Sequence, residues 1–469
     1  MKKVFIYSIF ALASVSFVGC KKWLDVGPEN VVLEADALKT PEDMQKLLVS
    51  CYDVAGNVFD GRIQNLAELL SDNLTEPLNN LDLTSVYDRE VTFFNNTTNG
   101  VYTDIYRGIF RCNSLLESFD LIEGLSAEDK LRIESEAKFL RALNHYWVLK
   151  IWSQPWGYTP DNSHMGIVLR ESAAADPLPR SSVAQAYDFI ISDLLYAYEN
   201  LPDNNGNFAN KMAAAGLLAQ VLFQKNDYAG AANYASIVIN SGQFTLEPTL
   251  DVFHAFSSEI GLEQNPEAVF QIVSTVNSSI IDVRNEGFRD NYWAGTAGSQ
   301  LSYSQNLLNF FNLTPTDGRK NAWIAQANGQ FQSLKFGSND VQAYYFSIPL
   351  IRLSHLKLIR AEALASAGTD LTTAIEDVND IRDRAFGEGL NNLESTATAT
   401  QIINAARDEF RKETISEGYR IDQIRRLGAL GLPMEVRGAP WDCPGMAIQF
   451  PNSEFSGSLF VGNEEGGCN

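Results

Sequence analysis

The sequence has few of the side chains that build metal centres. Its 469 residues include four histidines and five cysteines, and no two cysteines stand in a C-x-x-C arrangement. Structural zinc sites depend on such spacings, so we predict no metal ion and no cofactor. The patterns G-x-S-x-G, H-E-x-x-H and the P-loop are missing as well. Because those patterns mark common catalytic sites, we predict no catalytic residues and a protein that is not an enzyme.

Basic residues are also scarce. There are 36 lysines and arginines against 58 acids, a formal net charge of -22. Nucleic-acid binding requires a cationic surface that displaces counterions from phosphates, so the sequence argues against a nucleic-acid partner. Beyond the first 19 residues, no apolar stretch approaches the roughly 20 residues that a spanning helix needs.

The beginning of the chain resembles a lipoprotein leader. Lys2 and Lys3 precede an apolar run over residues 4–18, which ends at Gly19-Cys20. This pattern predicts a signal peptide over 1–19, with Cys20 as the lipid-carrying first residue of the mature chain. The run is too short for a transmembrane anchor. A plain secretory signal, in which Cys20 is incidental, is the alternative. Residues 20–40 are then a tether.

Apolar residues recur at helical spacing over much of the chain. Thr40-Pro41 is a helix start, with an N-cap threonine and proline at the first helical position. We expect longer helices over 101–121, 126–152 and 182–201.

Two helix pairs carry small residues at contact positions, as tetratricopeptide hairpins do. They are predicted over 210–240 and over 354–367 with 370–386. Residues 271–345, rich in Asn, Ser, Gly and aromatics, lie between them. The predicted fold is therefore mostly α: degenerate hairpins form a solenoid scaffold, and an irregular, loop-rich insert binds the ligand. We expect an N-terminal helical region over 41–243 and a C-terminal region over 244–469.

Two segments combine aromatic rings with Asn, Asp, Gln and Arg, the side chains that suit the C–H faces and hydroxyls of sugars. They are residues 72–99 and residues 289–323. The candidate ligand-binding residues in them are Tyr87, Arg89, Asn291, Tyr292, Trp293 and Trp323. The alternative for each aromatic ring is burial in a cluster that packs the loops.

Seven charged residues lie mostly in apolar helical segments, where an unpaired charge carries a large desolvation cost. We predict structural ion pairs for Glu136, Arg141, Arg352, Glu362, Arg382, Glu417 and Arg420. Cys443 and Cys468 bracket a tail containing Gly and Pro, and a disulfide between them is one expectation. Cys51 and Cys112 lie in helical patterns that favour buried thiols.

Several segments, in a shared order, resemble the SusD/RagB family of Bacteroidetes outer-membrane lipoproteins. They are Glu136-Ala137-Lys138-Phe139-Leu140-Arg141-Ala142, Pro349-Leu350-Ile351-Arg352, Arg360-Ala361-Glu362-Ala363, the helix from Ala374 to Ala385, the run from Glu409 to Arg425, and Phe450-Pro451 with Glu454.

The resemblance implies a lipid-anchored outer-membrane protein that faces the cell exterior. Such a protein binds nutrient glycan and hands it to a partner SusC-like TonB-dependent transporter. A peptide-capturing member of the same family, a surface glycoside hydrolase and a purely structural scaffold are the alternatives. Lys21-Lys22, directly after the lipid site, leave open which face of the membrane the protein serves.

Overall fold

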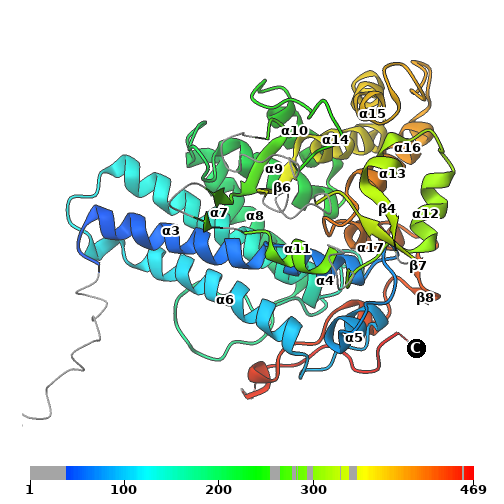
Figure 1. Cartoon of the computed structure of the whole chain (residues 1–469). Helices are drawn as coiled ribbons and strands as arrows, with labels where there is room; N and C mark the ends of the chain where they lie inside the picture. The colour runs from blue at the N-terminus through cyan, green and yellow to red at the C-terminus, as the bar shows by residue number, and fades with distance from the viewer. Residues whose placement is uncertain are drawn as a thin grey trace, which may run out of the picture.

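The structure is a computed structural model that is mostly helical, as expected (Figure 1). It describes residues 38–253, 265–276, 281–282, 284–292, 299–327, 329–336, 346–456 and 459–468. The predicted signal peptide, the lipid site Cys20 and the candidate Trp293 lie outside these ranges. Among the described helices, none has an apolar stretch long enough to cross a bilayer.

The named elements of the N-terminal half are all helices. Its helices are α3 (Pro41–Val58), α4 (Arg62–Leu69), α5 (Leu81–Asp88), α6 (Asn96–Glu117), the 3-10 turn η2 (Phe119–Leu121), α7 (Ala127–Trp152), α8 (Val183–Asn200), α9 (Lys211–Gln224) and α10 (Tyr228–Ile239).

The second half mixes short elements with a further helical group. Its helices are α11 (Glu286–Tyr292), α12 (Gln305–Asn312), α13 (Gly318–Trp323), α14 (Leu353–Ala367), α15 (Leu371–Phe386), α16 (Ala399–Glu413), α17 (Arg420–Ala429), η3 (Pro444–Met446) and η4 (Asn452–Ser456). Its strands are β1 (Ala268–Ile272), β2 (Thr275–Val276), β3 (Ile281–Asp282), β4 (Ile324–Ala327), β5 (Gln330–Ser333), β6 (Ile348–Arg352), β7 (Glu435–Val436) and β8 (Ala439–Pro440), which form two-stranded antiparallel sheets.

Capping side chains set several helix starts. Thr40 accepts a hydrogen bond from the backbone N–H of Asp43, whose carboxylate accepts one in return from the Thr40 N–H. The prediction for α6 was wrong at both ends, because this helix begins at Asn96 and stops at Glu117. Asn95 caps it, and its polar first turn gives no apolar periodicity from which to recognise a helix.

The two predicted helix pairs lie side by side, although about a hundred residues separate them in sequence. Helix α10 packs against α9 on one side and α14 on the other, and α15 and α16 pack against α14 (Figure 1). Strand β1 pairs with β6, so that Ala268 lies opposite Arg352. The insert therefore leaves the scaffold and returns to it at one point.

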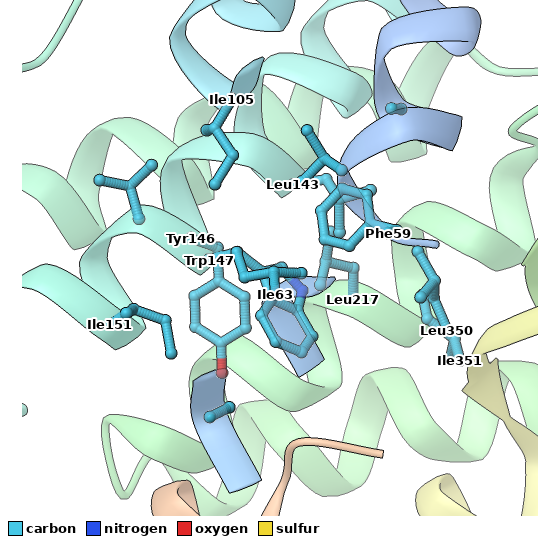
Figure 2. Packing of buried hydrophobic residues seen from close by; sticks show 14 of the residues in the cluster. Phe59, Ile63, Ile105, Leu143, Tyr146, Trp147, Ile151, Leu217, Leu350 and Ile351 are labelled. Atoms are coloured by element: carbon cyan, nitrogen blue, oxygen red, sulfur yellow. The ribbon is translucent and has the colours of Figure 1, made fainter. Parts of the chain in front are cut away.

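The main core joins residues from distant parts of the chain. Figure 2 shows Phe59 and Ile63 packed near Leu143 and Trp147 of α7, with Ile351 of β6 close by. These side chains are almost fully buried. Because β6 runs through this core, the segment that ends the insert is held by the N-terminal helices.

All seven charged residues singled out from the sequence are ion-paired in this structure. Arg141 binds Asp193 of α8 through two bonds of 2.8 Å. The other pairs are Glu136 with Arg132, Glu362 with Arg407 and Arg426, Arg382 with Glu409, Arg420 with Asp72, and both Arg352 and Lys335 with Glu417. Glu136 pairs with Arg132 within its own helix.

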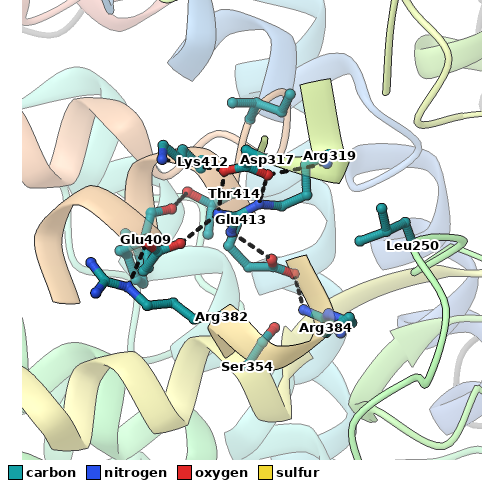
Figure 3. Close-up of polar contacts among 12 residues, drawn as sticks. Leu250, Asp317, Arg319, Ser354, Arg382, Arg384, Glu409, Lys412, Glu413 and Thr414 are labelled. Atoms are coloured by element: carbon teal, nitrogen blue, oxygen red, sulfur yellow. Dashed lines mark hydrogen bonds and ion pairs between the residues drawn. The ribbon is translucent and has the colours of Figure 1, made fainter. Parts of the chain in front are cut away.

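Arg352 stands at the centre of a buried charge network. Its guanidinium contacts Glu267 at 2.6 Å, Glu413 at 2.8 Å and Glu417 at 2.6 Å. Figure 3 shows Glu413 between Arg319 of α13 and Arg384 of α15. The network therefore connects the insert to the C-terminal helices.

The charges in this network hold one another ionised. Burial alone would raise the pKa of Glu413, but Arg384 and Arg352 outweigh burial and lower that pKa to about 2. Glu413 therefore stabilises the fold at neutral pH, and its contribution is lost as the pH falls from the unfolded value near 4.5 toward 2.

We predict that Arg352→Ala lowers the free energy of unfolding by about 3–5 kcal/mol, because it leaves three buried carboxylates without their shared cation. Denaturant unfolding followed by circular dichroism measures the change. The control is Arg107→Ala, which removes a half-exposed arginine paired with Asp104 and should cost about 0–1 kcal/mol. Equal losses in the two variants would contradict the central role of Arg352.

Candidate ligand-binding surfaces

Two of the aromatic candidates are core residues, and their predicted role in ligand binding is corrected. Tyr292 is 2% exposed and packs near Phe288 and Phe336, with its ring centroid 5.2 Å from that of Phe336. Trp323 is 1% exposed, and its indole N–H donates to the Leu250 carbonyl. These rings belong to the main hydrophobic core, which extends into the insert.

Tyr87 and Arg89 are also engaged inside the protein. The Arg437 guanidinium lies 4.0 Å from the centroid of the half-buried Tyr87 ring. Arg89 is 5% exposed and donates to the Val436 carbonyl. Arg89 nevertheless lines a surface cavity described below.

Asn291 borders a polar cavity of about 530 Å³ between α4, α5, α6 and α11. We call it the polar cavity; its walls include Asn80, Thr97, Asp104, Arg107, Asn291 and Gln300. Residues from both predicted segments thus meet here. The Asn291 amide donates to the Gly287 carbonyl at 2.7 Å, and Asn80 donates to Gln300 at 3.2 Å.

Both arginines of the polar cavity are already paired with carboxylates of the protein. Arg62 contacts both Asp60 and Asp104, and Arg107 contacts Asp104 at 2.8 Å. Burial raises the pKa of Asp60 to about 6. A ligand here would compete with these pairs for hydrogen bonds, and no aromatic ring among the described residues lines the cavity.

A second surface combines exposed aromatic rings with polar groups. Phe94 is 68% exposed, and its ring centroid lies 4.3 Å from that of Phe93, which in turn lies 5.9 Å from Phe455. We call these three residues the aromatic shelf. Phe93 and Phe94 belong to the predicted segment 72–99, whereas Phe455 comes from the far end of the chain and had no sequence signal.

Next to the shelf is a cavity of about 400 Å³, which we call the tail cavity. Phe93 belongs to both features, because it also lines the cavity. The remaining walls are residues 89–92 on one side and Gly445, Ala447, Gln449 and residues 464–467 on the other. In Figure 1 the C-terminal segment runs beside α5, where the two sides meet. Glu464 and Glu465 are exposed there and supply carboxylate acceptors.

The C-terminal wall of the tail cavity is fixed by covalent and hydrogen bonds. Cys443 and Cys468 form a disulfide in this structure. The Gln449 side chain both donates to the Asn463 carbonyl and accepts from its N–H, each at 2.9 Å. Gly445 has no room for a side chain, since a Cβ there would lie 1.9 Å from the Arg89 carbonyl oxygen. These constraints hold the tail against the segment that follows α5.

Comparison with known families identifies the fold and its lineage. Residues 22–223 match a SusD-like model described as starch-binding and associating with the outer membrane, and residues 285–435 match the model of the SusD family. Together the two matches cover most of the chain. This protein therefore belongs to the SusD/RagB family.

Individual relatives are distant but extend over most of the chain. A SusD-like protein of Formosa agariphila is 26% identical over 465 residues, which covers 89% of this chain and 90% of that protein. The starch-binding protein SusD of Bacteroides thetaiotaomicron is 23% identical and covers 71% of this chain and 70% of its own. Another Formosa agariphila SusD-like protein, 25% identical, is matched over 50% of its length.

Solved structures support the same fold. A SusD superfamily protein of Bacteroides thetaiotaomicron superposes with a TM-score of 0.78 at 21% identity, covering 91% of this chain and all of that one. A superfamily protein of Bacteroides vulgatus gives a TM-score of 0.79 at 21% identity, covering 91% and 99%.

We predict that Cys468→Ser lowers the free energy of unfolding by about 3 kcal/mol, because it opens a loop that spans 25 positions of sequence. Denaturant unfolding measures the loss. A reductant should destabilise the wild-type protein by a similar amount and leave Cys468→Ser unchanged. Full alkylation of both cysteines in the folded, unreduced protein would show that the bond is absent.

Proposed function

We propose that this protein binds a glycan at the aromatic shelf and tail cavity and does not cleave it. One observation carries the proposal: Phe93 packs against both Phe455 and Phe94, which is 68% exposed, and it also lines a hollow of about 400 Å³ whose walls include carboxylates. Apolar rings pack against the C–H faces of a sugar, while carboxylates accept from its hydroxyls.

The properties of relatives favour the same ligand class. One family model is described as starch-binding, and a relative is named as a starch-binding protein. A surface of rings and acceptors is compatible with an α-glucan, so maltoheptaose is the first probe to use. The polar cavity is the competing site, because its amide and charged groups would also suit hydroxyls.

The residues before α3 are proposed to attach the protein to the membrane. We infer that the chain is processed before Cys20, lipidated there and anchored at the outer membrane, with 20–40 as its tether. A ligand caught at the shelf would then pass to a SusC-like TonB-dependent transporter. The family model's description, associating with the outer membrane, supports this location.

Phe94→Ala is predicted to weaken maltoheptaose binding about tenfold in calorimetry, equivalent to about 1.4 kcal/mol, because it removes the most exposed ring. The melting temperature should stay the same, since this side chain contributes little to the core. Leu81→Ala is the matched control: Leu81 is an apolar side chain, 87% exposed, on neighbouring α5.

Three outcomes would redirect this proposal. Normal binding by Phe94→Ala with weak binding by Gln300→Ala would move the site to the polar cavity. Binding of peptides but of no glycan in a panel would favour the peptide-capturing alternative. Release of new reducing ends from a polysaccharide would identify a glycoside hydrolase instead.

Lipidation predicts that Cys20→Ser moves the protein from the membrane fraction to the soluble fraction of a host that processes lipoproteins, because one cysteine carries all the acyl chains. Cys112→Ser is the control for loss of a thiol, and it should remain with the membrane. If Cys20→Ser stayed membrane-bound after a high-salt wash, the anchor would lie elsewhere.

A further inference from the structure

A small cavity lies where α7 meets α17, in a part of the protein that the proposed glycan site does not use. Its volume is about 20 Å³, and about 10–15 Å³ is enough for one water-sized occupant. Its walls include Tyr146, Lys150, Trp156, Tyr187, Asp422 and Arg425. Trp156 is half-buried.

Arg425 faces the cavity with hydrogen-bond donors that the protein does not use. The residue is 3% exposed, and its Nη1 donates to the Lys150 carbonyl at 2.6 Å. Its Nε and Nη2 have no partner in the described part of the chain. Buried donors on a charged group carry a large free-energy cost when left without an acceptor, so the site favours an occupant that accepts hydrogen bonds.

The cavity also has an excess of positive charge. Lys150 and Arg425 carry two positive charges against the single negative charge of Asp422, whose carboxylate lies 2.6 Å from the Lys150 ammonium. Arg426, on the same wall, is paired with Glu362 at 2.8 Å. The rings of Trp147 and Tyr419 lie against the Lys150 ammonium, with its nitrogen 3.9 and 4.5 Å from their centroids.

Burial makes the unbalanced charge costly. It lowers the pKa of Arg425 to about 10, in the direction expected for a cation that has lost water without gaining a full counter-charge. A neutral water molecule would accept a hydrogen bond but leave the extra charge in place. A monovalent anion would both accept the hydrogen bonds of Arg425 and balance the extra positive charge.

We propose that this cavity is a halide site, in which one chloride accepts hydrogen bonds from Nε and Nη2 of Arg425 and balances the charge it shares with Lys150. The small volume favours a monatomic anion over phosphate or sulfate. Because α17 supplies Arg425 and α7 supplies Lys150, the bound ion would strengthen the contact between the N-terminal and C-terminal helices.

The test measures the melting temperature of the whole protein while chloride replaces gluconate at constant ionic strength. Binding to the folded state should raise Tm by about 1–2 °C for each tenfold increase in chloride above Kd. Asp422→Asn, which removes the competing negative charge, should make the protein respond at lower chloride concentrations. Arg425→Gln should abolish the response, and Arg289→Gln, a surface neutralisation of the same size, should retain it.

A crystal grown in sodium bromide gives a second readout that does not depend on a variant that folds. An anomalous bromide peak within hydrogen-bond distance of Arg425 Nε and Nη2 would support the site. A water molecule there without anomalous signal, or equal Tm values in chloride and gluconate for both the wild-type protein and Asp422→Asn, would overturn the proposal.

Discussion

The buried contact between Arg352 and three glutamates is the interaction on which the architecture depends. Glu267 precedes β1, Glu413 ends α16 and Glu417 lies in the turn before α17, so one guanidinium on β6 joins the start of β1 to the segment between α16 and α17. Burying these charges is costly unless all are paired. The segments that carry them must therefore come together in one arrangement, which fixes where the insert joins the scaffold.

That junction also explains why some aromatic side chains are buried and others are exposed. The insert is anchored by charge at its base, while its rings Phe288, Tyr292 and Phe336 pack with Phe253 and Phe346 from the chain on either side of it. The rings of the aromatic shelf lie elsewhere, on the segment after α5 and on the C-terminal tail. A disulfide and the bonds of Asn463 hold that tail in place, so the aromatic shelf is built on constrained backbone. Constrained groups lose less entropy when a ligand binds.

The sequence predicted local helix signals and buried charges well, because both have short-range causes. Thr40-Pro41 has the chemistry of a cap, and Arg141 in an apolar helix must find a partner wherever the chain folds. It predicted the exposure of aromatic side chains poorly. Tyr292 and Phe94 stand in similarly polar stretches, and only tertiary packing decides that the first is buried and the second exposed. Phe455 could not be paired with Phe93 from sequence, since more than 350 residues separate them.

The glycan is proposed to bind where the constrained tail meets the segment after α5. Hydrogen exchange measured with and without saturating maltoheptaose tests this proposal most directly, because it reports the site without any substitution. Bound maltoheptaose should slow exchange in residues 89–94 and 445–468 and leave exchange in α14, α15 and α16 unchanged. Protection confined to the walls of the polar cavity, around Asn80 and Gln300, would contradict the proposal.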